Sequence, residues 1–549
     1  MNLSRIKRWI LLGHRWLGIG TCLLFFLWFL SGVVMMYVGH PKLTWQERLE
    51  HLPPLEASQP LLSPADAFQQ AGIQGTVTDL RLANARAGQP VYIARIRPDP
   101  RPAPDAPRPE PRLLALDART GALLPPTDPA TALASAQVYL EQGGLSHPSS
   151  SSTLPASGPR QPSTAPGAPG KPLYQGITVE DAHTHSKAMD LHRPLHKVLL
   201  PDADQTLLYI SGTTGEVVRD APRLERGFNY LGAWLHWLYL FRDTAIDWTD
   251  LIIWLSVIGT VATLSGFLAG IIRWRFSRPY RSGSRSPFAP GALRWHHILG
   301  LVFALTTFTW IFSGLMSMNP WDIFEADESI IDARRISNPD IQPSRAIATP
   351  QALLASTTTP VRELQWHTLL DKARVKAIRT HDVPPGSADQ PVLLSARTGK
   401  PYNLEPERLR SALFTLQAGY PPRIDILRQD DFYYYSRTEH TMTGGRKPHP
   451  LPIWRVRYDD PNQTWLHIDP ATGQVLSELD SYQRTERWLF ALLHSWDWLP
   501  LLQNRPLWDI VMLVLAAGGL ALSATGIWIA GHRLHIKTRR WRLLRRKAR

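Results

Sequence analysis

The chain has 549 residues, enough for several domains, and its single cysteine, Cys22, excludes an internal disulfide. The net charge of +14 comes from three short segments, 1–15, 273–295 and 531–549, which carry 19 basic residues and no Asp or Glu. The remainder has 41 basic and 46 acidic residues, so no nucleic-acid partner is expected.

Four apolar stretches each have about the 20 residues that a helix needs to cross a hydrocarbon core of about 30 Å. They cover 16–38, 251–272, 296–318 and 507–530. We therefore predict four transmembrane helices, without the broken helices that transport sites favour. The first stretch is too long for a signal peptide and lacks a good cleavage site, so we expect it to remain as an anchor.

The three basic segments flank these stretches, where the positive-inside rule places Lys and Arg on the cytoplasmic side. Both termini are then cytoplasmic. The large segments 39–250 and 319–506 lie outside, which in a two-membrane bacterium is the periplasm. The prediction is a multi-pass protein of the inner membrane, in contact with lipid.

The sequence contains an internal repeat. HRWLG at 14–18 aligns with HHILG at 296–300, and Ser31-Gly32 aligns with Ser313-Gly314 at the same interval along the chain. Each half also carries two strand-turn-strand patterns with Thr-Gly at the turn. These four patterns lie at 116–124, 210–218, 394–402 and 468–476. Four dipeptides place Pro at the first position of a predicted helix, namely Ser63-Pro64, Asp128-Pro129, Thr349-Pro350 and Glu405-Pro406.

Each half ends with an aromatic stretch before its second span, FNYLGAWLHWLYLF at 228–241 and RWLFALLHSWDWLPLL at 487–502. Trp and Tyr favour the membrane interface, so we predict short helices at the outer surface. Between the predicted modules of the first half, the segment 146–172 consists mostly of Ser, Pro and Gly, which predicts a disordered linker. The Pro-rich segment 98–111 predicts an extended loop.

The predicted fold class is a membrane protein with a four-helix transmembrane bundle made of two tandem repeats, and two α+β periplasmic regions. In chain order we expect 1–38 as cytoplasmic N-terminus and first span, 39–227 as first periplasmic region with the linker at about 146–172, 228–274 as interfacial helix and second span, 275–295 as basic cytoplasmic loop, 296–318 as third span, 319–484 as second periplasmic region, 485–530 as interfacial helix and fourth span, and 531–549 as basic cytoplasmic tail.

The repeat brings four histidines into two pairs. Both halves enter the membrane in the same direction, so an axis along the membrane normal relates them. His14 and His296 then face each other at the cytoplasmic side, and His236 and His494 at the outer side. We name these the inner pair and the outer pair.

An iron porphyrin takes axial imidazoles from opposite sides, and a helix bundle can supply them. The residues therefore suggest b-type haem, with two haems about 30 Å apart along the helices. Because the chain has no Cys-x-x-Cys-His motif, coordination alone would hold them. The alternative is that the histidines cap helix ends or contact lipid headgroups.

Other histidines are weaker candidates. His297 is a possible substitute for His296. His192 and His196 have the i, i+4 spacing of metal ligands, but Pro194 argues against a continuous helix there. His440 and His449 occupy the corresponding region of the second half, whereas His532 and His535 fit lipid contact. The predicted chemistry needs no catalytic acid, base or nucleophile, so no catalytic side chain is expected.

HRWLG followed by FLSG, the paired Thr-Gly hairpins, and the LHW and LHSW sequences before the second and fourth spans resemble the PepSY-associated transmembrane family. This resemblance implies four spans with periplasmic PepSY modules. For the branch of ferric-siderophore reductases of the ferrioxamine reductase type, it implies b-type haem and electron delivery to ferric chelates. By position, the haem ligands would be His14, His296, His236 and His494.

The resemblance and the histidine pairs together suggest an oxidoreductase that reduces a ferric siderophore in the periplasm during iron uptake. The cytoplasmic segments of 15, 23 and 19 residues are too short for a dinucleotide-binding fold, so the electrons must come from quinol or a separate reductase. One alternative is a non-enzymatic PepSY sensor, or a peptide-binding protein that regulates a protease. Another is a permease, although the spans lack charged residues apart from Asp509.

Overall fold

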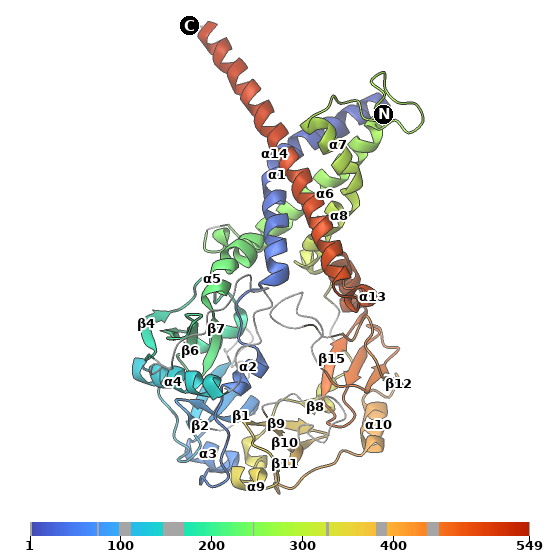
Figure 1. Cartoon of the computed structure of the whole chain (residues 1–549). Helices are drawn as coiled ribbons and strands as arrows, with labels where there is room; N and C mark the ends of the chain where they lie inside the picture. Colours follow the sequence, from blue (N-terminus) through green and yellow to red (C-terminus); the bar gives the residue numbers. More distant parts are fainter. Residues whose placement is uncertain are drawn as a thin grey trace, which may run out of the picture.

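The computed structural model describes residues 3–73, 76–97, 111–145, 170–244, 246–325, 329–379, 392–435, 437 and 449–547. Long helices gather at one end of the molecule, together with both ends of the chain, and the β-sheets lie at the other end (Figure 1). Most of the predicted linker at 146–172, most of the predicted loop at 98–111, and His440 lie outside the described residues.

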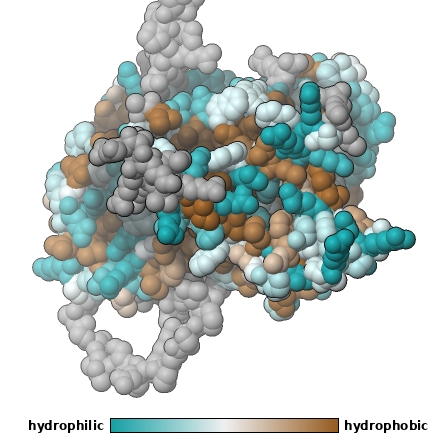
Figure 2. Space-filling view, turned by 90° about the horizontal axis from the view of Figure 1, so that it is seen from above, coloured by the Kyte–Doolittle hydropathy of each residue, from teal (hydrophilic) through white to brown (hydrophobic). Residues whose placement is uncertain are grey.

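The helical end identifies a multi-pass membrane protein with three to four candidate spans. Three helices are long and apolar enough to cross a membrane, and they cover Ser4–Tyr37, Trp248–Arg273 and Leu507–Arg539. They belong to α1 (Leu3–Tyr37), α6 (Trp248–Arg273) and α14 (Leu507–Lys547). Seen from this end, apolar side chains cross the middle of the face with hydrophilic ones around them (Figure 2).

The prediction of an unbroken third span is wrong. The segment forms α7 (Ala292–Val302) and α8 (Ala304–Met316), which meet at an angle of 67°. Phe303 lies at the break, and its ring packs against the backbone of α14 at Gly518, where an added Cβ would meet the ring at 2.3 Å. The contact with α14 therefore lies at the residue where the third span changes direction.

Small residues allow the helices to approach closely. α1 packs along both α14 and α6, α8 packs on α6, and α7 packs on α14. The ring of Phe29 fills the space beside Gly519, and the side chains of Phe25 and Ile311 fill the space beside Gly259. Such close backbone contact supplies the packing that holds helices together in lipid.

Two four-stranded antiparallel sheets form the two sides of the sheet region (Figure 1). One contains β4 (Leu173–Thr178), β5 (Leu195–Leu199), β6 (Leu207–Ser211) and β7 (Val217–Ala221); the other contains β12 (Arg423–Leu427), β13 (Ile453–Arg457), β14 (Trp465–Ile468) and β15 (Val475–Leu479). In each sheet the strands pair in chain order. The helix before the first strand packs on each sheet, α4 (Pro129–Leu145) on the first and α10 (Pro406–Thr415) on the second.

A third sheet joins the two halves of the chain. Its order is β11-β10-β9-β1-β2-β3, with β8 (Ser337–Asn338) paired to β9. The other strands are β1 (Val77–Arg86), β2 (Gln89–Ile96), β3 (Arg112–Asp117), β9 (Glu363–Leu369), β10 (Lys372–Ile378) and β11 (Val392–Ser395). Leu80 pairs with Trp366 and Leu82 with Leu364. No pattern in the sequence indicated that the two predicted regions would share a sheet.

The remaining helices are short and lie in the sheet region or beside the bundle. They are α2 (Trp45–Glu50), α3 (Pro64–Gln70), α5 (Arg223–Asn229), α9 (Pro350–Leu354), α11 (Ser481–Glu486), α12 (Leu493–Ser495) and α13 (Leu499–Leu502). Short helical turns at Tyr230–Trp234, Tyr239–Phe241 and Arg487–Leu492 complete the two aromatic stretches. The prediction of short helices in these stretches is confirmed.

The predicted turns and helix starts are confirmed. Strand pairs or single bridges flank all four Thr-Gly turns. Their glycines adopt left-handed φ angles of 70°, 77°, 71° and 70°, a conformation that disfavours other residues. The four helices predicted to start with Pro begin at Pro64, Pro129, Pro350 and Pro406.

Candidate functional site: two histidine pairs beside the long helices

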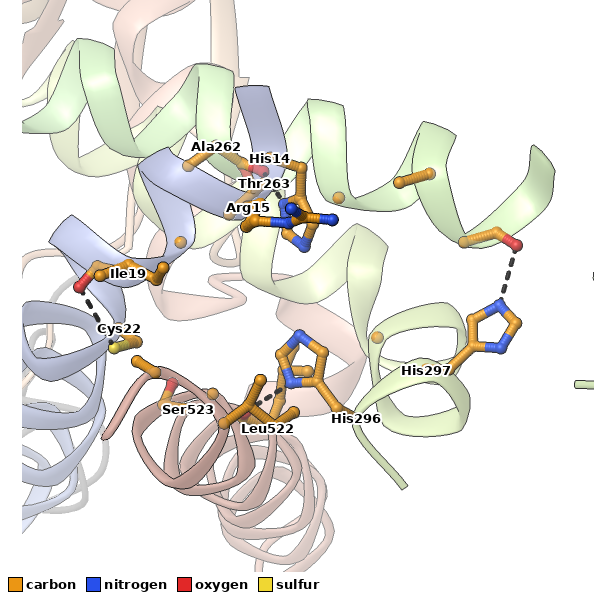
Figure 3. Close-up of a pocket in the computed structure, with 18 of the residues that line it drawn as sticks. His14, Arg15, Ile19, Cys22, Ala262, Thr263, His296, His297, Leu522 and Ser523 are labelled. Atoms are coloured by element: carbon orange, nitrogen blue, oxygen red, sulfur yellow. Dashed lines mark hydrogen bonds between the residues drawn. The ribbon is translucent and has the colours of Figure 1, made fainter. Parts of the chain in front are cut away.

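The inner pair lies between α1 and α7. His14 and His296 point toward one another across a cavity (Figure 3). Their ring centres are 6.3 Å apart and the ring planes differ by 24°. The prediction that packing brings these two histidines together is therefore met by the geometry.

One ring nitrogen of each inner histidine is held by the neighbouring helix. Nδ1 of His14 lies 3.2 Å from the carbonyl oxygen of Ala262, and Nδ1 of His296 lies 3.3 Å from that of Leu522 (Figure 3). A carbonyl oxygen only accepts, so Nδ1 carries the proton and Nε2 keeps its lone pair. Neither Nε2 has a hydrogen-bond partner within the described part of the chain. Both nitrogens are free to bind a metal.

A glycine of the neighbouring helix lies beside each imidazole of the inner pair. An added Cβ on Gly266 of α6 would lie 2.7 Å from Cε1 of His14. On Gly526 of α14, it would lie 3.5 Å from Cε1 of His296. Gly266 therefore permits a close approach that any larger residue would block, and Gly526 occupies the matching place beside the second ring.

The cavity between the inner histidines has a volume of about 240 Å³. Its walls come from α1, α6, α7, α8 and α14 and are mostly apolar. Besides the two histidines, the lining includes Cys22 and three arginines, Arg15, Arg273 and Arg533. A mostly apolar cavity with a few polar groups is the usual form of a cofactor site.

The outer pair has a related geometry. The ring centres of His236 and His494 are 6.2 Å apart, with their planes at 77°. Nδ1 of His236 lies 3.0 Å from Oγ of Ser31, and Nδ1 of His494 lies 3.0 Å from Oγ of Ser313. Each serine hydroxyl donates to a carbonyl of its own helix, so it accepts from the imidazole. Nε2 is again the nitrogen left with a lone pair.

A sharp turn after each outer histidine fixes its position. Leu238 and Trp496, two residues further on, have left-handed φ angles of 52° and 51°. Non-glycine residues rarely adopt this conformation, and those that do are found more often at functional sites. The indoles of Trp248 and Trp508 hold the turns, because each donates to the carbonyl of the residue that directly follows the histidine, at 2.7 and 3.0 Å.

His297 is unsuited to replace His296. It is buried, with Nδ1 at 2.8 Å from Oγ of Ser286 and Nε2 at 2.9 Å from the carbonyl oxygen of Gly270. Both ring nitrogens are therefore engaged. The rings of Trp274 and Phe288 pack edge-on against it, which points to a role in holding the loop after α6.

The other candidates lie in the sheet region. His192 ends a short 3-10 helix and contacts Oγ of Ser211 at 3.0 Å, whereas His196 lies in β5 and contacts the hydroxyl of Tyr174 at 2.9 Å. The two do not share a helix, so they lack the geometry of an i, i+4 ligand pair. His449 lies 2.7 Å from a carboxylate oxygen of Asp430. His532 and His535 are exposed on α14.

The residues around the histidines were missed by the sequence analysis. Gly266 and Ala262 of α6 are separated from Gly526 and Leu522 of α14 by one constant interval, which the repeat could have revealed. Within the described residues, no three His, Cys, Asp or Glu side chains gather as a metal site. Each histidine pair thus offers two ligands, which suits a metal whose remaining ligands belong to a cofactor.

Comparison with known proteins gives a family. No curated protein matches the sequence. The model of the PepSY-associated TM region matches residues 11–416, which includes His14, His236 and His296. A match over this share of the sequence establishes that the chain belongs to the PepSY-associated transmembrane family.

Proposed function

We propose that the protein is a haem-containing electron-transfer protein of the bacterial inner membrane that reduces ferric siderophores on the periplasmic side during iron uptake. The observation that carries the proposal is the geometry of the two histidine pairs. In both pairs the ring centres are separated by nearly the same distance, 6.3 and 6.2 Å. In both pairs Nδ1 of each histidine has a hydrogen-bond partner, and Nε2 has none within the described residues.

This separation fits ligation of one iron by two imidazoles. A metal–imidazole bond is about 2 Å long and the ring centre lies about 1 Å behind the nitrogen, so two rings on opposite sides of one metal have centres about 6 Å apart. Histidines that only cap helix ends or contact lipid headgroups have no reason to keep this spacing twice. The four residues present therefore fit two b-type haems.

The protein's own contribution is to hold and orient the ligands. The acceptors of Nδ1–H fix the tautomer and the ring orientation. They are two backbone carbonyls and the hydroxyl of Thr525 at the inner pair, and two serine hydroxyls at the outer pair. The apolar walls of the inner cavity restrict water and, with these hydrogen bonds, set the reduction potential of a bound iron. When bound, haem at the two pairs would supply one-electron centres between the donor and the ferric substrate.

α1 places the two pairs at different depths. It carries His14 of the inner pair and Ser31, which contacts the outer pair, and this interval of a continuous helix spans about 25 Å. Two haems, one at each pair, would shorten the distance that an electron must cross between the pairs. We place quinol or a separate reductase at the inner pair as the electron donor, and the ferric chelate beyond the outer pair.

The outer pair lies close to the sheet region, where the chelate would bind. The ring of Trp237, next to His236, is 6.1 Å from that of His40, and Nε2 of His40 accepts a hydrogen bond from the guanidinium of Arg219 in β7 at 3.0 Å. Gain of one electron converts Fe(III) of the chelate to Fe(II), and hard oxygen donors hold Fe(II) less tightly. Iron release then needs no side chain acting as an acid or nucleophile.

Matched contacts support the proposal of two tandem repeats. The interval from His14 to His296 is the same as the interval from Ser31 to Ser313. A second constant interval relates α6 to α14, because Ala262 and Leu522, like Trp248 and Trp508, make corresponding contacts. With the basic segments on the cytoplasmic side, both termini are cytoplasmic and the sheets are periplasmic.

The resemblance to reductases of the ferrioxamine type favours a siderophore as the chelate. The break between α7 and α8 removes one argument against a permease. However, the ring of Phe303 fills this break against Gly518, whereas the broken helices of transport sites direct backbone groups toward a substrate. The reductase therefore remains the function that the geometry favours.

The visible absorption spectrum of the purified protein, before and after dithionite, tests the proposal. We expect the bands of b-type haem, sharpened on reduction. His236→Ala and His494→Ala should each remove the outer haem and spare the inner one. A colourless protein from haem-replete cells would contradict the proposal and favour a PepSY sensor or peptide-binding role. Loss of both haems, or of neither, would show that the pairing is wrong.

A further inference from the structure

Three arginines from different helices line the inner cavity: Arg15 of α1, Arg273 at the end of α6 and Arg533 of α14. The guanidinium of Arg273 lies over the ring of Phe288, at 5.5 Å from its centre. Within the described residues, none of the three guanidinium groups has a hydrogen bond or an ion pair. The sequence segments to which they belong, 1–15, 273–295 and 531–549, contain no Asp or Glu.

These three charges act on one another. Arg533 lies within electrostatic range of both Arg15 and Arg273. Like charges around one cavity repel each other, and the apolar walls screen them less than water would. The cluster therefore lacks a counter-charge, which an anionic group in the cavity would supply.

The arginines occupy matching places relative to the inner histidines. The interval from Arg273 to Arg533 is the same as the interval from Gly266 to Gly526. Arg273 follows Gly266 by two helical turns, about 10 Å along α6. The cavity thus offers two metal ligands in its interior and, about two turns away, two guanidinium groups in equivalent positions.

A b-type haem has the complementary shape and charge. Its iron lies at the centre of the ring, and its two propionate carboxylates leave the same edge, one on each side of a line through the iron. Arginine matches a carboxylate with parallel N–H donors, which makes it the preferred partner of such a group. A lipid phosphate shares the negative charge but provides no group to lie between the imidazoles.

We propose that Arg273 and Arg533, assisted by Arg15, bind the two propionate carboxylates of the inner haem and so set its orientation, with the propionate edge toward the cytoplasm. This inference rests on the proposed function. It assigns to the arginines a role that neither the histidine pairing nor the positive-inside rule requires.

The test compares haem b with haem dimethyl ester, in which both carboxylates are neutralised. The protein is produced without haem in the His236→Ala background, where only the inner pair can bind haem, and is titrated with each compound in vesicles. We expect the protein to prefer haem b by about tenfold or more, because charge-assisted hydrogen bonds are lost in the ester. In Arg273→Gln/Arg533→Gln the two affinities should become nearly equal.

Arg278→Gln is the matched control, because Arg278 lies in the same basic segment as Arg273, is exposed and does not line the cavity. It should keep the preference for haem b. A second readout is the midpoint potential of the inner haem. It should fall in the double variant, because loss of the two guanidinium charges leaves the propionates uncompensated beside the iron and disfavours the reduced state. It should stay unchanged in Arg278→Gln.

Several outcomes would overturn the inference. Equal affinity for haem and its ester of the protein that keeps all three arginines, or a midpoint potential that does not fall in the double variant, would show that the arginines do not bind the propionates. An effect of the double variant that appears with the anionic lipid phosphatidylglycerol but not with zwitterionic phosphatidylcholine would assign the arginines to an anionic lipid headgroup. If the ester distinction fails while the haem spectrum persists, only this inference is wrong; absence of haem from the native protein would refute the proposed function as well.

Discussion

Oγ of Ser31 lies 3.0 Å from Nδ1 of His236, although the two are far apart in the chain. The contact explains why a serine interrupts the first apolar stretch at position 31. Ser31 accepts the imidazole N–H, and Gly32 lies beside the same ring, where an added Cβ would make an ordinary contact at 3.7 Å from Cε1 of His236. Ser313 makes the same contact with His494.

The first prediction concerns this acceptor. Ser31→Ala should weaken the outer haem about tenfold to a hundredfold, the usual effect of losing the hydrogen bond that orients a ligating histidine. The inner haem should be unaffected. Transfer of haem to apomyoglobin, followed by its absorption spectrum, measures the change. Ser317→Ala is the control, because Ser317 is exposed and its hydroxyl donates to the carbonyl of Gly314, one turn back in the chain.

The second prediction concerns Gly266. In Gly266→Ala the new Cβ would lie 2.7 Å from Cε1 and 2.9 Å from Nδ1 of His14, so the ring must leave the carbonyl of Ala262. We expect the inner haem to be lost and the outer haem to remain, as measured by the haem content per protein. Gly20→Ala on α1 is the control, because an added Cβ there meets nothing within 4 Å. Equal haem loss in both variants would contradict the role of Gly266.

The third prediction uses Cys22, the single cysteine of the chain, as a reporter of the inner cavity. N-ethylmaleimide should label Cys22 faster in haem-free protein than in haem-loaded protein, as followed by mass spectrometry, because haem would fill the space beside the thiol. In Cys22→Ser/Leu23→Cys the thiol moves to a position that is 58% exposed. Its labelling should not depend on haem, and a dependence would point to a global change instead.

An ion-pair network in the sheet region ties the two halves of the chain together. Arg81 of β1 donates to both carboxylate oxygens of Glu216 at 2.7 and 2.8 Å and lies 3.6 Å from Glu363 of β9. Arg48 of α2 donates to both oxygens of Glu363 at 2.7 and 3.0 Å. Both glutamates are buried, so each depends on its arginine.

The fourth prediction follows from the pKa of Glu216. Burial alone would raise this pKa, but the charges of Arg81, His192 and Arg48 outweigh it and lower the pKa from 4.5 to about 2. A lowered pKa stabilises the fold above the unfolded value of 4.5, and this contribution is lost as the pH falls toward 2. The melting temperature, followed by tryptophan fluorescence, should therefore decline over this range more steeply in the native protein than in Glu216→Gln.

Arg81→Met tests the same network near neutral pH. The substitution leaves Glu216 without its partner and should lower the free energy of unfolding by about 3–5 kcal/mol. Arg423→Met is the matched control, because the Arg423–Asp459 pair is 71% and 75% exposed, and the expected cost there is less than about 1 kcal/mol. Similar costs for the two variants would contradict the structural role of Arg81.

The local elements of the fold were largely predictable. Proline at helix starts and glycine at the Thr-Gly turns act through backbone geometry within a few residues. The predicted helix starts and turns are therefore found in the structure. The third span is different. Phe303 has no helix-breaking residue beside it, and its ring inserts against Gly518 of α14, in the other half of the bundle and distant in the chain. At the position that the predicted repeat aligns with Phe303, Thr21 bonds to Leu17 within the continuous helix α1.

The site divides in the same way. The interval of the sequence repeat was enough to predict the four histidines as candidates, because it places equivalent residues at the same depth in the membrane. It could not tell which nitrogen would be free. That depends on the carbonyls of Ala262 and Leu522, which are available only because α6 and α14 pack against the imidazoles.

The sequence by itself determined the candidate spans, the location of the basic segments, the turns and the pairing of the histidines, because hydropathy, charge and a fixed interval can be read along one dimension. Only the tertiary structure decided that β1 and β9 join the halves in one sheet, that α7 and α8 bend, and that Arg15, Arg273 and Arg533 share a cavity. These features depend on which surfaces meet, and contacts between distant segments are fixed by the fit of side chains in three dimensions.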